Sequence, residues 1–139
     1  KELQGEVFIQ SFQPSHPVIN MSITDNFEKF AEFELKNREK NFLPPFTNLI
    51  SLIISSKVEK KAKDFSKDFS TKILSNFPDI KVYGPAPSII FQKNKLFRYR
   101  ILIKILKRSS SNKIKKFLMK KHTYNNVKMV VDIDPINFS

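Results

Sequence analysis

Leu96-Phe97-Arg98-Tyr99-Arg100-Ile101-Leu102-Ile103-Lys104-Ile105-Leu106 is the longest run of strand-forming residues in the chain. Because side chains alternate between the two faces of a sheet, one face of this strand carries Phe97, Tyr99, Ile101, Ile103 and Ile105. That face predicts a buried core. The opposite face carries Leu102 and three cations, which lie close to the spacing of successive backbone phosphates: Arg98, Arg100 and Lys104.

Outward from this strand, periodicity and turn residues predict an α+β fold. The expected order is strand, helix, strand, strand, strand, helix, strand. These elements cover residues 46–56, 57–76, 80–83, 88–91, 96–106, a helix from about 109, and 127–133. Gly84-Pro85-Ala86-Pro87 is expected to break the chain between the two short strands. We therefore predict two helices packed on one face of a mostly antiparallel sheet.

The first 44 residues follow a different pattern. Glu6 to Phe12 alternates apolar and polar side chains and predicts a strand, which a short helix follows. A second helix then ends at Pro44-Pro45, because proline removes amide donors and restricts the preceding residue to extended conformations. We expect a connecting helix over 23–44 and a compact domain over 45–139.

The net charge of +12 is unevenly placed along the chain. Residues 1–56 hold five basic and seven acidic residues, whereas residues 57–139 hold twenty basic and six acidic ones. Such a basic block attracts phosphate through a long-range, salt-sensitive field, which favours nucleic acid as a ligand. A lysine-rich, solvated surface is the alternative interpretation of the lysines as a set.

Several short motifs occur in the order found in a known family. They are Gly5-Glu6-Val7-Phe8-Ile9-Gln10, His16-Pro17, Glu34-Leu35 with Arg38, Pro44-Pro45-Phe46, Gly84-Pro85-Ala86-Pro87, Phe97 to Lys104, and Asp132-Ile133-Asp134-Pro135. In this order the chain resembles the C-terminal part of the PriA family of replication-restart helicases (primosomal protein N-prime). The resemblance implies that residues 1–22 are a strand and helix remnant of a RecA-like motor lobe. It also implies a C-terminal α+β domain similar to a small ribosomal RNA-binding protein.

The residue types present predict no catalytic activity for this chain itself. There is no Gly-x-x-x-x-Gly-Lys-Ser/Thr loop to hold a triphosphate, and there is no cysteine to bind zinc. We therefore expect no catalytic, cofactor or metal site; ATP, magnesium and zinc are implied only for a full-length parent. No apolar run is long enough to cross a bilayer, and the absence of cysteine fits a cytoplasmic protein.

The sequence predicts a DNA-binding surface around the long strand. Its residues are Lys93, Lys95, Arg98, Arg100 and Lys104. The alternative is that Arg98 and Arg100 form ion pairs with Asp132 and Asp134, which share one face of the closing strand. The sequence alone leaves both open.

A second basic group lies at the start of the last helix, where free amides favour anions. The family resemblance implies that Lys107, Arg108 and Asn112 contact the acidic, phenylalanine-terminated tail of single-stranded-DNA-binding protein. Asp132 and Asp134 are predicted to be structural, because two carboxylates without a nearby histidine make a poor metal site.

The sequence therefore predicts a binding module of a primosomal restart helicase. Its expected ligands are branched or single-stranded DNA, single-stranded-DNA-binding protein and other primosome proteins, with no membrane. One alternative is an independent RNA-binding protein of ribosomal type. Another is that the sequence represents a complete ATP-dependent helicase.

Overall fold

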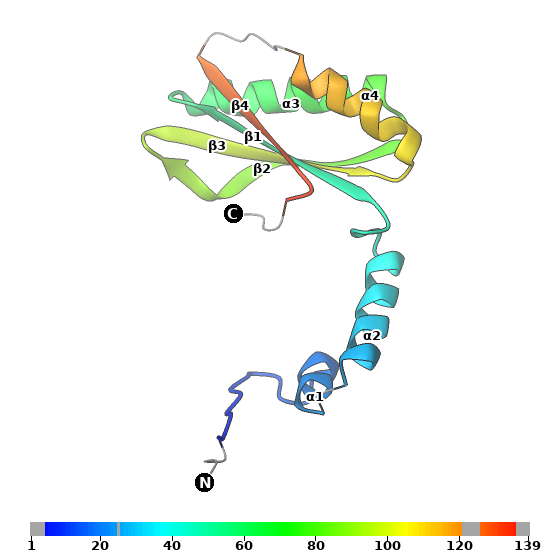
Figure 1. The fold of residues 1–139 in the computed structure, drawn as a ribbon. Coiled ribbons are helices and arrows are strands. Elements are labelled where there is room, and N and C mark those ends of the chain that lie inside the picture. Colours follow the sequence, from blue (N-terminus) through cyan, green and yellow to red (C-terminus); the bar gives the residue numbers. More distant parts are fainter. Residues whose placement is uncertain (1–4, 25, 121–125, 136–139) are drawn as a thin grey trace. The chain divides into compact units, whose positions relative to one another are not determined.

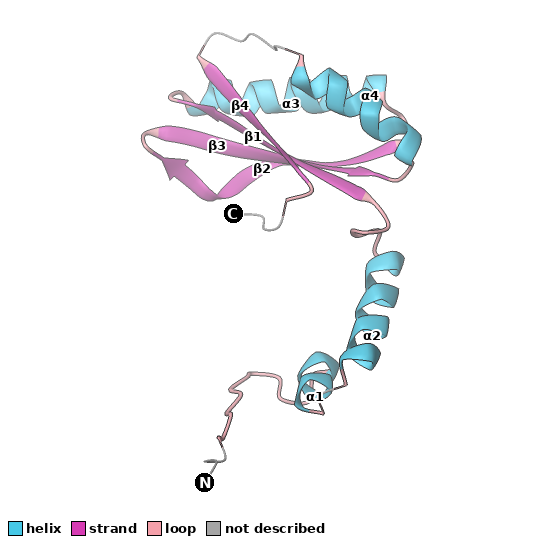
Figure 2. Cartoon of the chain, in the orientation of Figure 1, coloured by secondary structure: helices cyan, strands magenta, loops and turns pink. Residues whose placement is uncertain are grey.

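A computed structural model describes residues 5–24, 26–120 and 126–135. It divides into two compact units, Lys1–Asn37 and Arg38–Ser139. The elements are α1 (Pro17–Ile23), α2 (Phe27–Lys40), β1 (Asn48–Ser56), α3 (Glu59–Asn76), β2 (Ile80–Lys93), β3 (Leu96–Ile105), α4 (Arg108–Met119) and β4 (Val127–Ile133) (Figures 1 and 2).

The second unit is an α+β domain, as the sequence predicts. Its four strands form one sheet in the order β2-β3-β1-β4, and every neighbouring pair is antiparallel. Helices α3 and α4 lie on the same face of this sheet (Figure 1). The long strand β3 is therefore an inner strand, with β2 on one side and β1 on the other.

The core fills the space between the sheet and the two helices. It contains alternate residues of β1 and β3, the apolar stripe of α3 and two residues of α4: Ile50, Leu52, Ile54, Ile101, Ile103, Ile105, Phe65, Phe69, Ile73, Ile114 and Leu118. In α3 these residues recur every three or four positions, which places them on one side of a helix. Phe69 stacks against Phe65 at 5.4 Å and against Phe117 of α4 at 6.1 Å between ring centroids.

The predicted break at Gly84-Pro85 is wrong, because β2 runs as one strand through it. Gly84 has φ +94°, which side-chain-bearing residues rarely adopt, and the pairing with β3 shifts register between Tyr83 and Ala86. A positive φ allows an irregularity inside a strand, so the chain bulges and pairing resumes at Ala86 and Arg100. The strand then ends in a two-residue turn at Asn94-Lys95, whose φ values of 52° and 60° are typical of a type I′ hairpin.

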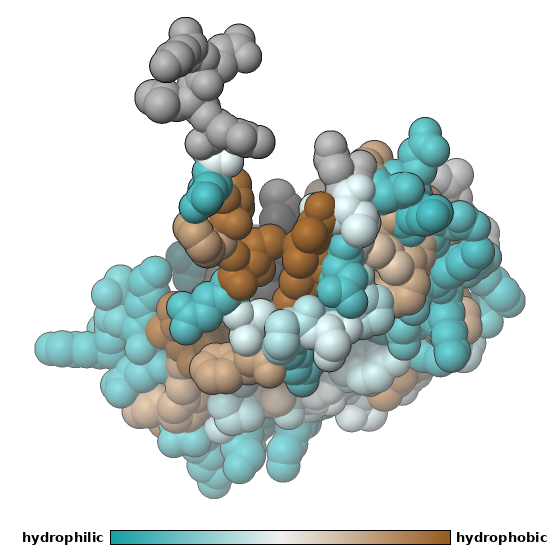
Figure 3. Space-filling view, turned by 90° about the horizontal axis from the view of Figure 1, so that it is seen from below, coloured by the Kyte–Doolittle hydropathy of each residue, from teal (hydrophilic) through white to brown (hydrophobic). Residues whose placement is uncertain are grey.

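The predicted strand over Glu6–Phe12 is also wrong, since these residues form neither helix nor strand. A segment becomes a strand only when its backbone groups pair with those of another strand, and no described residue pairs with this one. Its side chains are exposed, with Val7 at 89%, Phe8 at 88% and Phe12 at 108%. Figure 3 shows that hydrophobic side chains are present on the face of the molecule in view. The assignment of residues 1–22 to a motor lobe stays a prediction.

Candidate nucleic-acid interface

The sheet has a second face, made of the side chains that point away from α3 and α4; we call it the outer face. On β3 it carries Arg98, Arg100, Leu102 and Lys104, all half-buried, while Tyr99, Ile101, Ile103 and Ile105 are buried. This alternation confirms the predicted division of β3 into a core face and a cationic face. What the sequence could not supply is the strand order that surrounds these cations.

A groove lies at one end of the outer face, and we call it the outer groove. It has a volume of about 210 Å³. Its lining residues are Ile53, Ser55, Lys93, Asn94, Leu96, Arg98, Lys128 and Val130. Ser55 of β1 pairs with Arg98 on one side and with Lys128 on the other, so the two cations flank it. With strands about 4.8 Å apart, their backbones are separated by roughly 10 Å.

Arg98 is anchored at the rim of this groove. Its Nη1 donates a hydrogen bond to the Ile90 carbonyl at 3.4 Å. A guanidinium carries five N–H donors in a planar fork, so one such bond holds the side chain while other donors can bind an anion. Lys93 reaches the groove from the β2–β3 hairpin, whereas Lys95 is exposed and does not line it.

Arg100 and Lys104 lie farther along β3 and do not line the outer groove. Burial lowers the pKa of Arg100, and the neighbouring charge of Arg98 lowers it further. The Lys104 ammonium donates to the Asn41 carbonyl at 3.1 Å and lies 5.5 Å from the centroid of the Tyr83 ring. Lys104 therefore holds the segment that leads into β1, a structural role that the sequence did not predict.

Strand β1 separates the two aspartates of the closing strand from the strand that carries the arginines. In the register of the sheet, Asp132 is the partner of Ser51 in β1. Asp134 accepts the Leu49 N–H at 3.0 Å, and its own N–H donates to the Leu49 carbonyl at 2.8 Å. Asp134 thus ends β4 against the start of β1, in agreement with its predicted structural role.

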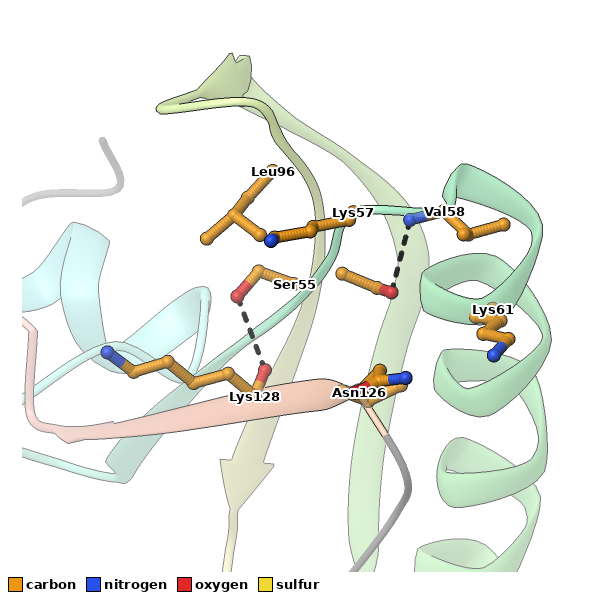
Figure 4. A pocket seen from close by; sticks show the side chains of 9 residues that line it. Ser55, Lys57, Val58, Lys61, Leu96, Asn126 and Lys128 are labelled. Atoms are coloured by element: carbon orange, nitrogen blue, oxygen red, sulfur yellow. Dashed lines mark hydrogen bonds between the residues drawn. The ribbon is translucent and has the colours of Figure 1, made fainter.

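A larger hollow adjoins the outer groove, and we call it the end pocket. Its volume is about 510 Å³. Its lining residues are Ser55, Ser56, Lys57, Val58, Lys61, Leu96, Asn126, Val127 and Lys128. Lys57 and Lys128 extend to the same side with Ser55 between them, while Lys61 projects from α3 on the other side (Figure 4).

Lys57, Lys61 and Lys128 line the end pocket but are not among the residues predicted from the sequence. Lys128 shares a strand face with Val130 and Asp132, which is visible from alternation in β4. Its closeness to Arg98 depends on β1 lying between the two strands, and no local pattern indicates that. For Lys57 and Lys61 the sequence contains no distinguishing signal among the many lysines of this region.

Two hydrogen bonds fix the corner from which the end pocket is built. Ser56 Oγ accepts the Val58 N–H at 3.2 Å, and the Tyr99 hydroxyl donates to Glu59 Oε1 at 3.0 Å. Burial raises the pKa of Tyr99, and the bond to Glu59 raises it further. The first turn of α3 is thereby tied to β3, which positions Lys57 and Lys61.

The basic group at the start of α4 lies elsewhere in the domain. Lys107 precedes the helix, and its Nζ lies 3.6 Å from Asp79 Oδ1. Asn112 is exposed, and the side chain of Arg108 lies outside what the structure describes. A hollow of about 200 Å³ is found beside the helix start, lined by Asn76, Phe77, Pro78, Asp79, Ser110 and Lys113.

The domain that carries these surfaces is similar to a known protein family. Residues 39–136 match the family model described as the primosomal protein N C-terminal domain. The chain belongs to this family. All the predicted site residues, the outer groove and the end pocket fall within the matched primosomal protein N C-terminal domain.

The chain is also similar to curated proteins named replication restart protein PriA. It is 32% identical over 140 residues to the one from Rickettsia prowazekii and 30% identical over 138 residues to the one from Rickettsia conorii. It is 30% identical over 135 residues to the one from Treponema pallidum. These matches cover 96–97% of the chain but only 20–21% of the relatives, so the chain spans about a fifth of their length.

Among the residues that the structure describes, no group of three or more histidine, aspartate and glutamate side chains is placed to hold a metal ion. Nor does any helix in this part of the chain have the length and hydrophobicity needed to span a bilayer.

Proposed function

We propose that this domain binds DNA for a replication-restart protein of the PriA type, through the outer groove and the cations around it. The observation that carries the proposal is the convergence of Lys93, Arg98 and Lys128 on one groove from three separate parts of the sheet. The function served would be docking on branched or single-stranded DNA, with strand separation and ATP hydrolysis assigned to the remainder of a longer parent.

The electrostatics of the groove support a phosphate ligand. Arg98 lines the groove, and Arg100 lies two residues farther along the same strand face, where its charge adds to the positive field around the groove. The apolar residues Ile53 and Val130 line the groove between the cations. That pattern suits a nucleic-acid strand, whose phosphates alternate with less polar sugars and bases.

Fluorescence anisotropy with a labelled single strand tests the proposal. The double variant Arg98→Gln, Lys128→Gln removes two groove cations, and we expect roughly tenfold weaker binding, or about 1.4 kcal/mol for the two cations together. The slope of log K against log salt should fall by roughly 0.7 for each phosphate that is no longer neutralised. The matched control is Lys67→Gln, Lys72→Gln, which makes the same charge change at exposed positions of α3.

Equal losses of affinity in the two double variants would show that a diffuse basic surface, rather than the outer groove, binds the DNA. Parallel titrations with forked DNA, duplex DNA and structured RNA address the alternative of an RNA-binding protein of ribosomal type. Preference for RNA at every salt concentration favours that alternative.

A second surface is proposed for single-stranded-DNA-binding protein, at Lys107, Arg108 and Asn112. The hollow beside the start of α4 supports it, because Phe77 and Pro78 supply apolar walls and Lys113 supplies charge. A ligand that combines acidic residues with a terminal phenylalanine complements both features. Other primosome proteins remain proposed partners without an assigned surface.

Titration of a labelled acidic peptide ending in phenylalanine tests this second surface. Arg108→Ala should weaken peptide binding several-fold and leave single-stranded DNA binding unchanged, because the described residues that line the outer groove differ from those that line the hollow beside α4. Lys116→Ala, which alters another lysine of the same helix, is the control. If Arg108→Ala weakens both ligands equally, a single surface serves both.

A further inference from the structure

The end pocket and the outer groove adjoin each other, since both are lined by Ser55, Leu96 and Lys128. A chain of nucleotides lying in the outer groove would therefore meet the end pocket next. The two hollows differ in size, at about 210 Å³ and about 510 Å³. The larger value lies within the range of about 300–1,000 Å³ that small-molecule sites occupy.

The lining of the end pocket has three chemical parts. Val58, Leu96 and Val127 supply apolar walls. Ser55, Ser56 and Asn126 supply hydroxyl and amide groups, and Lys57, Lys61 and Lys128 supply positive charge. A phosphate alone would use the lysines and the hydroxyl and amide donors and would leave the apolar walls without a ligand.

A nucleotide can contact the apolar, the polar and the positively charged lining residues of the end pocket together. Its base has two apolar faces and a polar edge, and its phosphates are anionic. Unpaired bases are commonly recognised by insertion between side chains with hydrogen bonds to their edges. A paired base inside a duplex is stacked and cannot enter such a hollow without being extruded.

We propose that the end pocket holds one unpaired nucleotide of a bound strand. The base lies against Val58, Leu96 and Val127, and its flanking phosphates lie near Lys57, Lys61 and Lys128. This inference rests on the proposed DNA binding and adds a substrate class, because it makes the site selective for unpaired over paired nucleotides. The bonds from Val58 to Ser56 and from Tyr99 to Glu59 keep the pocket preformed.

The test uses 2-aminopurine, a fluorescent adenine analogue whose emission increases when it leaves a base stack. Single strands carrying it at one internal position are titrated with the whole chain, beside duplexes of the same sequence. We expect an emission increase with the single strand and a weaker response with the duplex. Val58→Phe fills the pocket without changing charge, and it should abolish the increase.

Two lysines of α3 provide a matched pair. Lys61 lines the pocket and Lys63 does not, and both belong to the same helix. Lys61→Gln should weaken single-strand binding by roughly fivefold, whereas Lys63→Gln should leave it within about twofold of the original. Urea denaturation of each variant confirms that the fold is retained.

The outcomes separate this inference from the proposed function. Binding that depends on Arg98 and Lys128, without any emission change or any effect of Val58→Phe, overturns the nucleotide pocket and leaves the DNA-binding groove in place. Equal emission increases for single strand and duplex also overturn the selectivity. No binding of any nucleic acid overturns both the pocket and the proposed function.

Discussion

At the scale of single residues, Gly84 shows how one backbone position sets the shape of a strand. Its φ of +94° is disfavoured for residues with a side chain, and an added Cβ would lie 2.7 Å from the Arg100 carbonyl oxygen and 3.0 Å from the Ala86 nitrogen. We expect Gly84→Ala to lower the free energy of unfolding by about 1–3 kcal/mol, measured by urea denaturation. Gly5→Ala is the control, since nothing lies within 4 Å of a Cβ there, and its midpoint should not move. Identical midpoints for the two variants would show that β2 can relax around the bulge.

At the scale of elements, helix α3 is held by its apolar stripe rather than by its exposed charges. Phe69 is 1% exposed, whereas Leu74 on the same helix is 46% exposed. Phe69→Ala removes a ring that contacts both Phe65 and Phe117, and we expect a decrease of about 3–5 kcal/mol in the free energy of unfolding. Leu74→Ala should cost less than about 1 kcal/mol, because much of its side chain already meets water. Urea denaturation of both variants measures the difference, and a comparable decrease at Leu74 would contradict this account of the packing.

At the scale of the whole molecule, the two units should differ in stability. Residues 5–12 form no helix or strand, whereas Ile101 and Ile103 are fully buried in an inner strand. Hydrogen exchange followed by mass spectrometry should show rapid exchange in peptides over 5–12 and slow exchange over β3. Equal protection of Val7–Ile9 and Ile101–Ile103 at every protein concentration would show that the first segment has a partner within its own chain. Repeating the measurement on dilution identifies protection that arises between copies.

Much of the second unit was predictable because its signals are local. The alternation of Arg98, Arg100 and Lys104 with Tyr99 and the isoleucines is fixed by the period of a strand. The stripe of α3 follows from helical periodicity. Local signals failed at Gly84, where a glycine and a proline indicate a break but the paired strand β3 holds the bulge in place. They also failed at Glu6–Phe12, where alternation predicts a strand but none of the described residues pairs with the segment.

The candidate site was predictable only in part, for a physical reason. The sequence determined which side chains share a face of β3, and hence that Arg98 belongs to a cationic surface. Only the tertiary structure decided that β1 lies between β3 and β4, which places Lys128 across Ser55 from Arg98 and puts Asp132 two strands away from the strand that carries both arginines. Strand order depends on how the whole sheet buries its apolar face against α3 and α4. That burial is a property of the complete core, and no single stretch of the sequence contains it.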